Sequence, residues 1–227
     1  MGAYFDPASS CYFVFAEPSA APGLWDSYLG GARRSYRQHG VESAIEYAQV
    51  RDGRCTALFV GVLDGAGRVV GGLRVQGRLT ASEQAHAVGE WAGRPGTAEL
   101  HAQIADRLPF GVIEIKAVWV DYDDDRSALI AALARTFIHA MDVANVRYAL
   151  CTAAEHAAPR WQTSGGVIAS EVAAVAYPDE RYRTRLMWWD RRRIADLISA
   201  DQYAALTRES DLLFRRPATV PTLPSVA

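Results

Sequence analysis

Glu114 is a lone acid within Val112–Val120 (VIEIKAVWV), an almost continuous run of apolar and β-branched residues. A carboxylate buried in such a strand has a raised pKa, which suits it to accept a proton near neutral pH. Strand alternation puts Glu114 on the same face as Lys116 and Val118, so the alternative is a Glu114–Lys116 ion pair on a half-exposed face. We therefore predict Glu114 as a general base and keep the ion pair open.

Two arginines are candidates for holding an anion. Arg74 lies in the second strand of a predicted hairpin, and its planar fork fits a carboxylate or a phosphate; the alternative is an arginine on the strand surface. Arg126 lies in the acidic stretch Asp121–Ser127, just before a predicted helix. The acids of that stretch suit helix capping, and Arg126 could still meet a phosphate there.

Composition excludes several classes of function. Of the 227 residues, 50% are hydrophobic and 22% are charged, and the formal net charge is −2, so there is no basic field for nucleic acid. Cys11, Cys55 and Cys151 lack the spacing of a zinc site or a disulfide framework, so we predict no metal. No apolar run approaches the roughly 20 residues of a membrane span, and no signal-peptide pattern is visible. We predict a cytoplasmic protein.

Periodicity and turn residues predict an α/β (α+β) chain. Strands are predicted over 11–16, 57–63, 69–79, 112–120, 146–152, 167–177 and 182–190, and helices over 22–39, 127–143, 156–163, 190–198 and 200–209, with helical pieces within 81–108. The strand–helix–strand unit from 112 to 152 requires parallel strands. We predict one domain over 1–214, with its core at 11–190 and C-terminal helices over 190–209, and a loose tail over 215–227.

The hairpin Ala57–Gln76, ALFVGVLDGAGRVVGGLRVQ, and the order of the elements resemble the GNAT superfamily of N-acyltransferases over roughly residues 11–190. Within that superfamily the chain is most similar to the acyl-homoserine-lactone synthases and the long-chain N-acyl amino acid synthases. These have roughly a Gly-Gly-x-Arg pattern (here Gly71-Gly72-Leu73-Arg74), an insertion before the central strand (here 81–108), and a glutamate early in that strand (here Glu114).

The resemblance implies a mixed, mostly antiparallel central sheet flanked by helices, with a splayed central strand pair, 112–120 and 146–152. It implies transfer of an acyl group from acyl-CoA (acetyl-CoA included) or acyl carrier protein to an amine of a small molecule or peptide, without a metal. The backbones of Val118, Trp119 and Val120 would bind the acyl arm, and Arg126 and Ser127 would bind the pyrophosphate. A homodimer stays open.

The sequence departs from the family pattern at two places. Asp121–Ser127 has no glycine where most members have a glycine-rich pyrophosphate loop, and its acids would repel an anion. Trp161 stands where many members have a tyrosine that protonates the leaving thiolate, which tryptophan cannot do, so we assign it to the core or to an acyl channel. Two other functions therefore stay open: an inactive acyl-CoA-binding or regulatory module, and an unrelated partner-binding subunit with the same architecture.

Overall fold

The structure is a computed structural model that describes residues 2–121 and 126–215. Its strands are β1 Gly2–Asp6, β2 Cys11–Ala16, β3 Leu58–Leu63, β4 Val69–Gln76, β5 Val112–Val120, β6 Tyr148–Ala154, β7 Val167–Ile168, β8 Val175–Ala176 and β9 Arg183–Asp190. Its α-helices are α1 Pro22–Gln38, α2 Tyr47–Val50, α3 His86–Glu90, α4 Thr97–Arg107, α5 Ser127–Ala144, α6 Ala158–Gln162, α7 Ile194–Leu197 and α8 Ala200–Arg215. Short 3₁₀ turns are η1 Pro18–Ala20, η2 Glu42–Ile45, η3 Ser82–Gln84 and η4 Leu108–Phe110.

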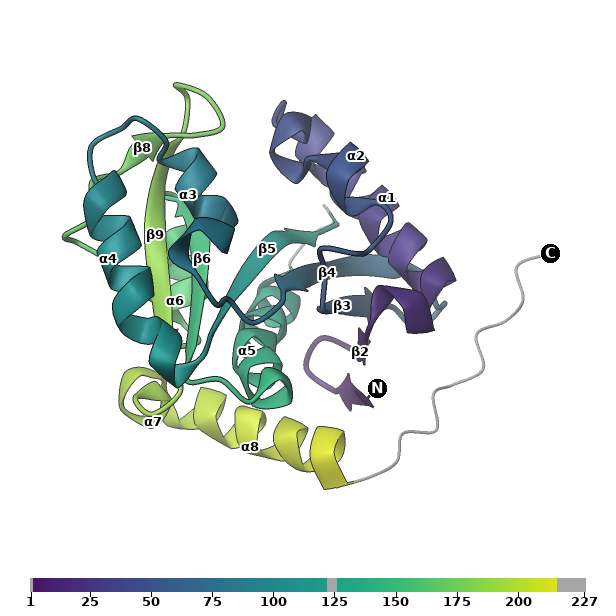
Figure 1. Cartoon of the computed structure of the whole chain (residues 1–227). Coiled ribbons are helices and arrows are strands. Elements are labelled where there is room, and N and C mark those ends of the chain that lie inside the picture. Colours follow the sequence, from purple (N-terminus) through teal and green to yellow (C-terminus); the bar gives the residue numbers. More distant parts are fainter. Residues whose placement is uncertain (1, 122–125, 216–227) are drawn as a thin grey trace. The chain divides into compact units, whose positions relative to one another are not determined.

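The strands form a nine-stranded sheet in the order β1-β2-β3-β4-β5-β6-β9-β7, and β8 also pairs with β9 (Figure 1). The β5–β6 pair is parallel, as the strand–helix–strand pattern predicted. The β1–β2, β2–β3, β6–β9, β7–β9 and β8–β9 pairs are antiparallel. The predicted fold class, a mixed sheet flanked by helices, is confirmed.

The chain divides into two compact units, which we describe separately. Unit 1 contains the described residues of 1–74, 117–133 and 203–227, and unit 2 contains 75–116 and 134–202. Elements β4, β5, α5 and α8 each run from one unit into the other. The prediction of a single domain over 1–214 stays a prediction, and most of the predicted tail lies outside the described residues.

Unit 1 has an aromatic core between α1 and β3 (Figure 1). Trp25 and Tyr28 on α1 pack against Phe59 on β3, with ring centroids 5.2 and 5.8 Å away. Burying such a side chain contributes about 1.5–3 kcal/mol each, so this face of α1 fixes the helix on the sheet. The helix ends where predicted, because Gly40 has a φ of 70° and can take the left-handed conformation.

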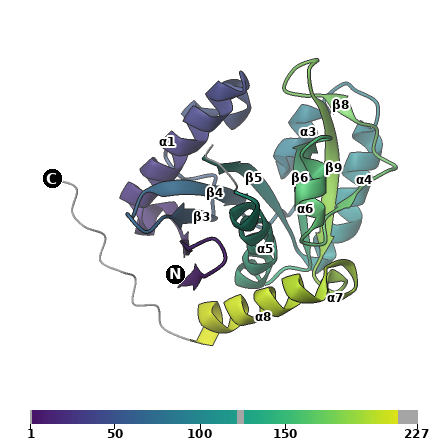
Figure 2. The same ribbon diagram turned by 180° about the vertical axis from the view of Figure 1, so that it is seen from behind.

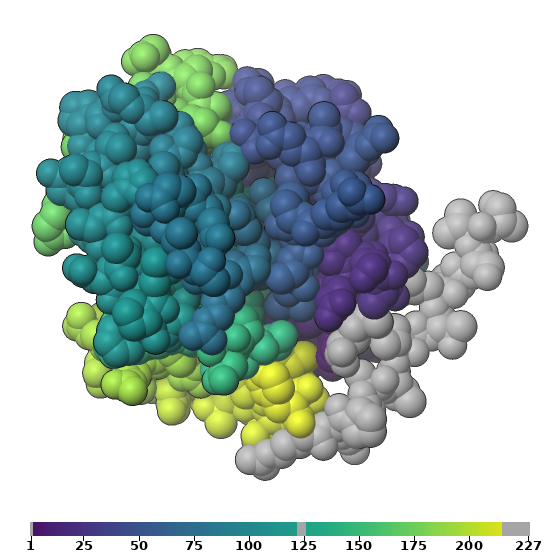
Figure 3. Space-filling view, in the orientation of Figure 1, coloured from purple at the N-terminus to yellow at the C-terminus, as the bar shows by residue number. Residues whose placement is uncertain are grey.

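Unit 2 has helices on both faces of its strands. Helices α3 and α4 cover one face of β6 and β9, and α6 covers the other, as the two opposite views show (Figures 1 and 2). Trp91, Leu100 and Ile104 fill the first layer, and Phe137, Trp161 and Trp189 stack in the second. The space-filling view shows the atoms of α3 and α4 as a closed layer over their face (Figure 3).

Helix α5 also has the length and hydropathy of a membrane span, with a mean hydropathy of 1.3. In the structure 61% of this helix is buried. The core helix of a globular protein meets the same criterion, so α5 is weak evidence for a membrane. The left-handed φ of 49° at Asn145 ends the helix, close to the end predicted at residue 143.

One predicted strand is wrong. The run 167–177 forms only the two short strands β7 and β8 instead of one strand. Between them the chain makes a turn in which the Val172 N–H donates to the carbonyl of Ala169 (3.1 Å). The Trp91 indole donates to the carbonyl of Ala173 (2.8 Å), so this carbonyl has a partner outside the sheet. The sequence pattern also missed β1, and α8 extends beyond its predicted end at residue 209.

Two adjacent glycines of α1 provide a matched test of the unit 1 core. A Cβ at Gly31 would overlap the ring of Trp119, whereas a Cβ at Gly30 would meet only the end of the Arg34 side chain at 3.6 Å. Gly31→Ala should lower the free energy of unfolding by about 1–3 kcal/mol through overpacking. Gly30→Ala should leave it unchanged or raise it by up to about 1 kcal/mol. Urea denaturation measures both, and equal stabilities would contradict this packing.

Candidate functional site

The pairing of β5 with β6 is short. It joins Val112–Ile115 to Tyr148–Cys151 and stops at the pair Ile115↔Cys151, although both strands continue. Two residues further along β5, Ala117 has a φ of 48°, which is rare for a residue with a side chain. Strand β5 continues to Val120, but its backbone is distorted at Ala117, soon after it stops pairing with β6. We call this distortion the interruption at Ala117, and the predicted splay of the two strands stays a prediction.

Tyr28 holds the interruption in place. Its hydroxyl donates a hydrogen bond of 2.8 Å to the carbonyl oxygen of Ala117, and the side chain is fully buried. Burial raises the pKa of Tyr28 well above its usual value, so the hydroxyl stays protonated and can donate. This is a positioning residue that the sequence analysis treated as ordinary helix core.

Beyond Ala117, the backbone of β5 alternates in direction. The N–H of Asp121 donates to the carbonyl of Val70 on β4 (2.8 Å), so Asp121 faces β4. Alternation then makes Trp119 face β4 as well, and the backbone groups of Val118 and Val120 point away from β4. Val118 and Val120 thus have the orientation that an added strand requires, and backbone binding by Trp119 stays a prediction.

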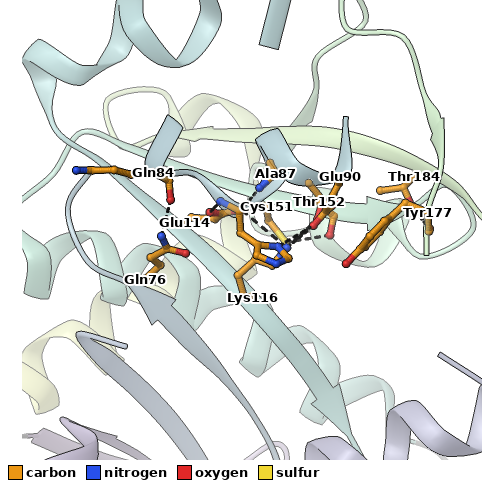
Figure 4. A network of polar contacts seen from close by, with 11 residues as sticks. Gln76, Gln84, Ala87, Glu90, Glu114, Lys116, Cys151, Thr152, Tyr177 and Thr184 are labelled. Carbon is orange, nitrogen blue, oxygen red and sulfur yellow. Dashed lines mark hydrogen bonds and ion pairs between the residues drawn. The ribbon is translucent and has the colours of Figure 1, made fainter. Parts of the chain in front are cut away.

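Before Ala117, two residues of β5 and one of α3 form a buried charge cluster in unit 2 (Figure 4). We define this charge cluster as Glu114 and Lys116 of β5 and Glu90 of α3. The Lys116 ammonium donates to Glu90 Oε1 and lies 3.8 Å from Glu114 Oε1. Each of the three residues is at most 8% exposed. Glu114 and Lys116 therefore do lie close together, but they are buried and not half-exposed as that alternative supposed.

Glu114 is bound on both oxygens. Oε2 accepts the backbone N–H of His86 (2.6 Å), and Oε1 accepts that of Ala87 (2.9 Å), at the start of α3. Burial raises the pKa of Glu114, and the nearby Lys116 ammonium opposes this rise. A raised pKa is the property predicted for a general base, but both oxygens already accept hydrogen bonds.

Glu90 is the member that the sequence analysis missed. It is 3% exposed, and its Oε1 also accepts the hydroxyl of Thr152 (3.1 Å). Burial raises its pKa, but Lys116 and His86 more than offset this, so the pKa is lowered overall. The sequence around residue 90 is polar and rich in alanine, so nothing in it indicated that Glu90 would be buried.

Two further side chains border the cluster in Figure 4. Tyr177 lies beside Thr152 with its hydroxyl toward the cluster, and both residues are half-buried. The thiol of Cys151 is buried, and burial raises its pKa to about 12, so it is an uncharged neighbour rather than a nucleophile.

Unit 1 contains buried donors that have no acceptor. Arg74 is 4% exposed, so the alternative of a surface arginine is wrong. Its Nε and Nη1, and the indole Nε1 of the buried Trp119, have no hydrogen-bond partner among the described residues. Buried donors without partners are costly and call for an acceptor such as an anionic ligand.

The remaining predicted site residues lie elsewhere. Trp161 stacks on Phe137 (5.4 Å between ring centroids) as part of the unit 2 core. Arg126 and Ser127 lie at the start of α5, and the rest of the predicted pyrophosphate loop, 122–125, lies outside the described residues. Within the described ranges, no cluster of three or more His, Cys, Asp or Glu is arranged to hold a metal ion.

Sequence comparison finds close relatives without an assigned activity. No family model matches the chain. It is 46% identical over 208 residues to the uncharacterized protein Rv1356c of Mycobacterium tuberculosis, covering 91% of this chain and 79% of that protein. The uncharacterized protein Mb1391c of Mycobacterium bovis matches with the same figures.

Structure comparison finds N-acyltransferase folds. FeeM, an N-acyl amino acid synthase from uncultured soil microbes, matches with a TM-score of 0.64 at 13% identity, over 85% of this chain and 96% of that one. The CoA-dependent acyl-homoserine lactone synthase BjaI matches with a TM-score of 0.51 at 17% identity, over 86% of each chain. The AHL synthase LasI matches with a TM-score of 0.52 at 9% identity, over 88% of this chain and 96% of that one. The predicted resemblance is confirmed at the level of the fold.

The hydrogen bond from Tyr28 to Ala117 predicts a measurable loss of stability. Tyr28→Phe removes the donor to the carbonyl of the half-buried Ala117, which should lower the free energy of unfolding by about 0.5–1.5 kcal/mol. Tyr12→Phe, at an exposed tyrosine of the same unit, should change it by less than about 0.5 kcal/mol. If urea denaturation finds Tyr28→Phe as stable as the wild type, this bond does not hold the strand.

Proposed function

We propose that this chain, which belongs to the family of the mycobacterial protein Rv1356c and has the fold of the GNAT N-acyltransferases, is itself an acyltransferase. It would move an acyl group from acyl-CoA or acyl carrier protein to an amine of a small molecule or peptide. The observation that carries this proposal is the end of β5–β6 pairing at Ile115↔Cys151, followed by the interruption at Ala117.

The donor would bind along β5. An extended pantetheine arm can pair with a free strand edge as an added strand does, and Val118 and Val120 direct their backbone groups away from β4. The backbone of Trp119 would belong to the same stretch of β5 that binds the pantetheine arm. Arg126 and Ser127, at the start of α5, would meet the pyrophosphate, where helix N–H groups favour anions.

Two further predicted residues, one in each unit, would bind the substrates. Arg74 is buried and lacks a partner on Nε and Nη1, which supports binding of a carboxylate or another anionic group. Trp161 would line an acyl channel with Phe137. A homodimer and a cytoplasmic location stay predictions.

Glu114 would be the base that takes the proton of the amine. Its burial raises its pKa toward the range in which a carboxylate can accept a proton at neutral pH. To do so, one of its oxygens must release the backbone N–H of His86 or Ala87. Backbone donors on the strand would meet the oxyanion that forms at the acyl carbon.

A second candidate is a module that binds acyl-CoA without turnover. The two N–H groups on Glu114 favour it, because a carboxylate so held serves equally well to fix the start of α3. Trp161, which stands where many members of the GNAT superfamily have the tyrosine that protonates the leaving thiolate, also favours it.

Thermal unfolding with acetyl-, octanoyl- and palmitoyl-CoA tests the proposal. A donor at about 100 times its Kd should stabilise the fold by about 2.7 kcal/mol, which raises the Tm by about 5–10 °C. Free CoA is the matched control and should give a smaller shift than the best acyl donor. The absence of a shift with every acyl-CoA would count against both candidate functions.

Glu114→Gln then separates the two candidates. If Glu114 is the base, the variant should bind acyl-CoA as the wild type does but lose about 10²–10⁴-fold in transfer rate to an amine. An unchanged transfer rate would remove Glu114 from the mechanism. A wild-type protein that binds acyl-CoA and never transfers the acyl group would be the inactive module.

A further inference from the structure

The charge cluster of unit 2 has one oxygen that no protein group satisfies. Glu90 Oε1 accepts from Lys116 and Thr152 and lies 3.3 Å from His86 Nδ1. Glu90 Oε2 is buried and has no hydrogen-bond partner among the described residues. Because a buried carboxylate oxygen without a donor is costly, a donor is expected there when the site is filled.

The charges of the cluster determine the sign of that donor. Two carboxylates, Glu90 and Glu114, surround one ammonium, that of Lys116. The cluster therefore has two acidic side chains and one basic side chain, and a buried carboxylate oxygen without a donor favours a cation as its partner. Burial keeps the Cys151 thiol protonated, so this neighbour adds no further negative charge.

The two carboxylates are not equivalent acceptors. Both oxygens of Glu114 already accept a backbone N–H at the start of α3. Only Glu90 has an oxygen without a donor, and a cation that brings its own N–H groups would supply both the charge and the hydrogen bond. A primary ammonium, with three N–H donors, fits this requirement.

The cluster lies where β5 and β6 stop pairing. Lys116 and Thr152 directly follow the last pair, Ile115↔Cys151. Thr152 and Tyr177, which border the cluster in Figure 4, are half-buried, whereas Glu90 and Lys116 are buried.

We propose that Glu90 Oε2 binds the protonated amine of the acceptor, so that the acceptor is a compound with a primary ammonium group. That this cation is the acceptor rests on the proposed acyltransferase function, whereas the binding of a primary ammonium at Glu90 does not. Glu114 then positions Glu90 by fixing the start of α3, whether or not it also takes the proton.

Carbon-13 NMR of the glutamate side-chain carboxyls tests this site in the full-length protein. Methylammonium chloride is the probe, and tetramethylammonium chloride at matched ionic strength is the control, because it has the same charge and no N–H donor. Glu90→Gln and Glu114→Gln assign the two signals, and Glu90→Asp provides a second variant that keeps the charge.

The Glu90 signal should move on titration with methylammonium and not with tetramethylammonium. Glu90→Gln should weaken methylammonium binding about tenfold or more, because a hydrogen bond to a charged group is lost. Glu99→Gln, at an exposed acid of α4, should leave binding unchanged. A Glu90 signal that does not move, or that moves equally with both cations, overturns the proposal.

This experiment contains no acyl-CoA, so it fails separately from the proposed function. If acyl-CoA binds and the Glu90 signal does not move with methylammonium, only the proposed ammonium site is wrong. If Glu90 responds and no acyl-CoA binds, the cation site stands and the acyltransferase proposal falls.

Discussion

A buried lysine is the constraint on which the arrangement of unit 2 depends. An ammonium can leave water only if opposite charges and hydrogen-bond acceptors surround it, and Lys116 has Glu90 and Glu114. Glu90 comes from α3 and Lys116 from β5, so the ion pair ties the inserted helix to the central strand. Glu114 extends the tie to the backbone of the first turn of α3. Removal of one partner would leave an uncompensated buried charge, which makes these groups interdependent.

This constraint bears on function through its place in the chain. The last β5–β6 pair immediately precedes Lys116, and the left-handed residue Ala117 immediately follows it. The last paired residue of β5 (Ile115), the buried lysine (Lys116) and the left-handed residue (Ala117) are thus consecutive along the strand. On the unit 1 side of this point, Tyr28 fixes the strand, and Arg74 has buried donors without acceptors. Among the described residues, Glu90 in unit 2 thus has a carboxylate oxygen without a donor, and Arg74 in unit 1 has guanidinium donors without an acceptor.

The sequence predicted what local pattern determines. Hairpin 57–76, the strand at 112–120 and the helix ending at Asn145 have strong periodicity or turn residues, and all three are confirmed. The pattern could not predict partners that meet only in the folded chain. Glu90 resembles any acid of a polar insertion until Lys116 packs against it. Tyr28 has the spacing of a core residue, and nothing local reveals that its hydroxyl reaches Ala117. The strand at 167–177 failed because the distant Trp91 takes one of its carbonyls.

The proposed function requires the β5 backbone beyond Ala117 to receive the acyl arm of the donor. Residue-resolved hydrogen exchange of the amides of Val118 and Val120, with and without octanoyl-CoA, measures whether it does. Both amides should exchange more slowly in the complex, while amides of β1, at an edge of the sheet, should keep their rates. Unchanged exchange at both valines in a protein saturated with octanoyl-CoA would contradict this requirement.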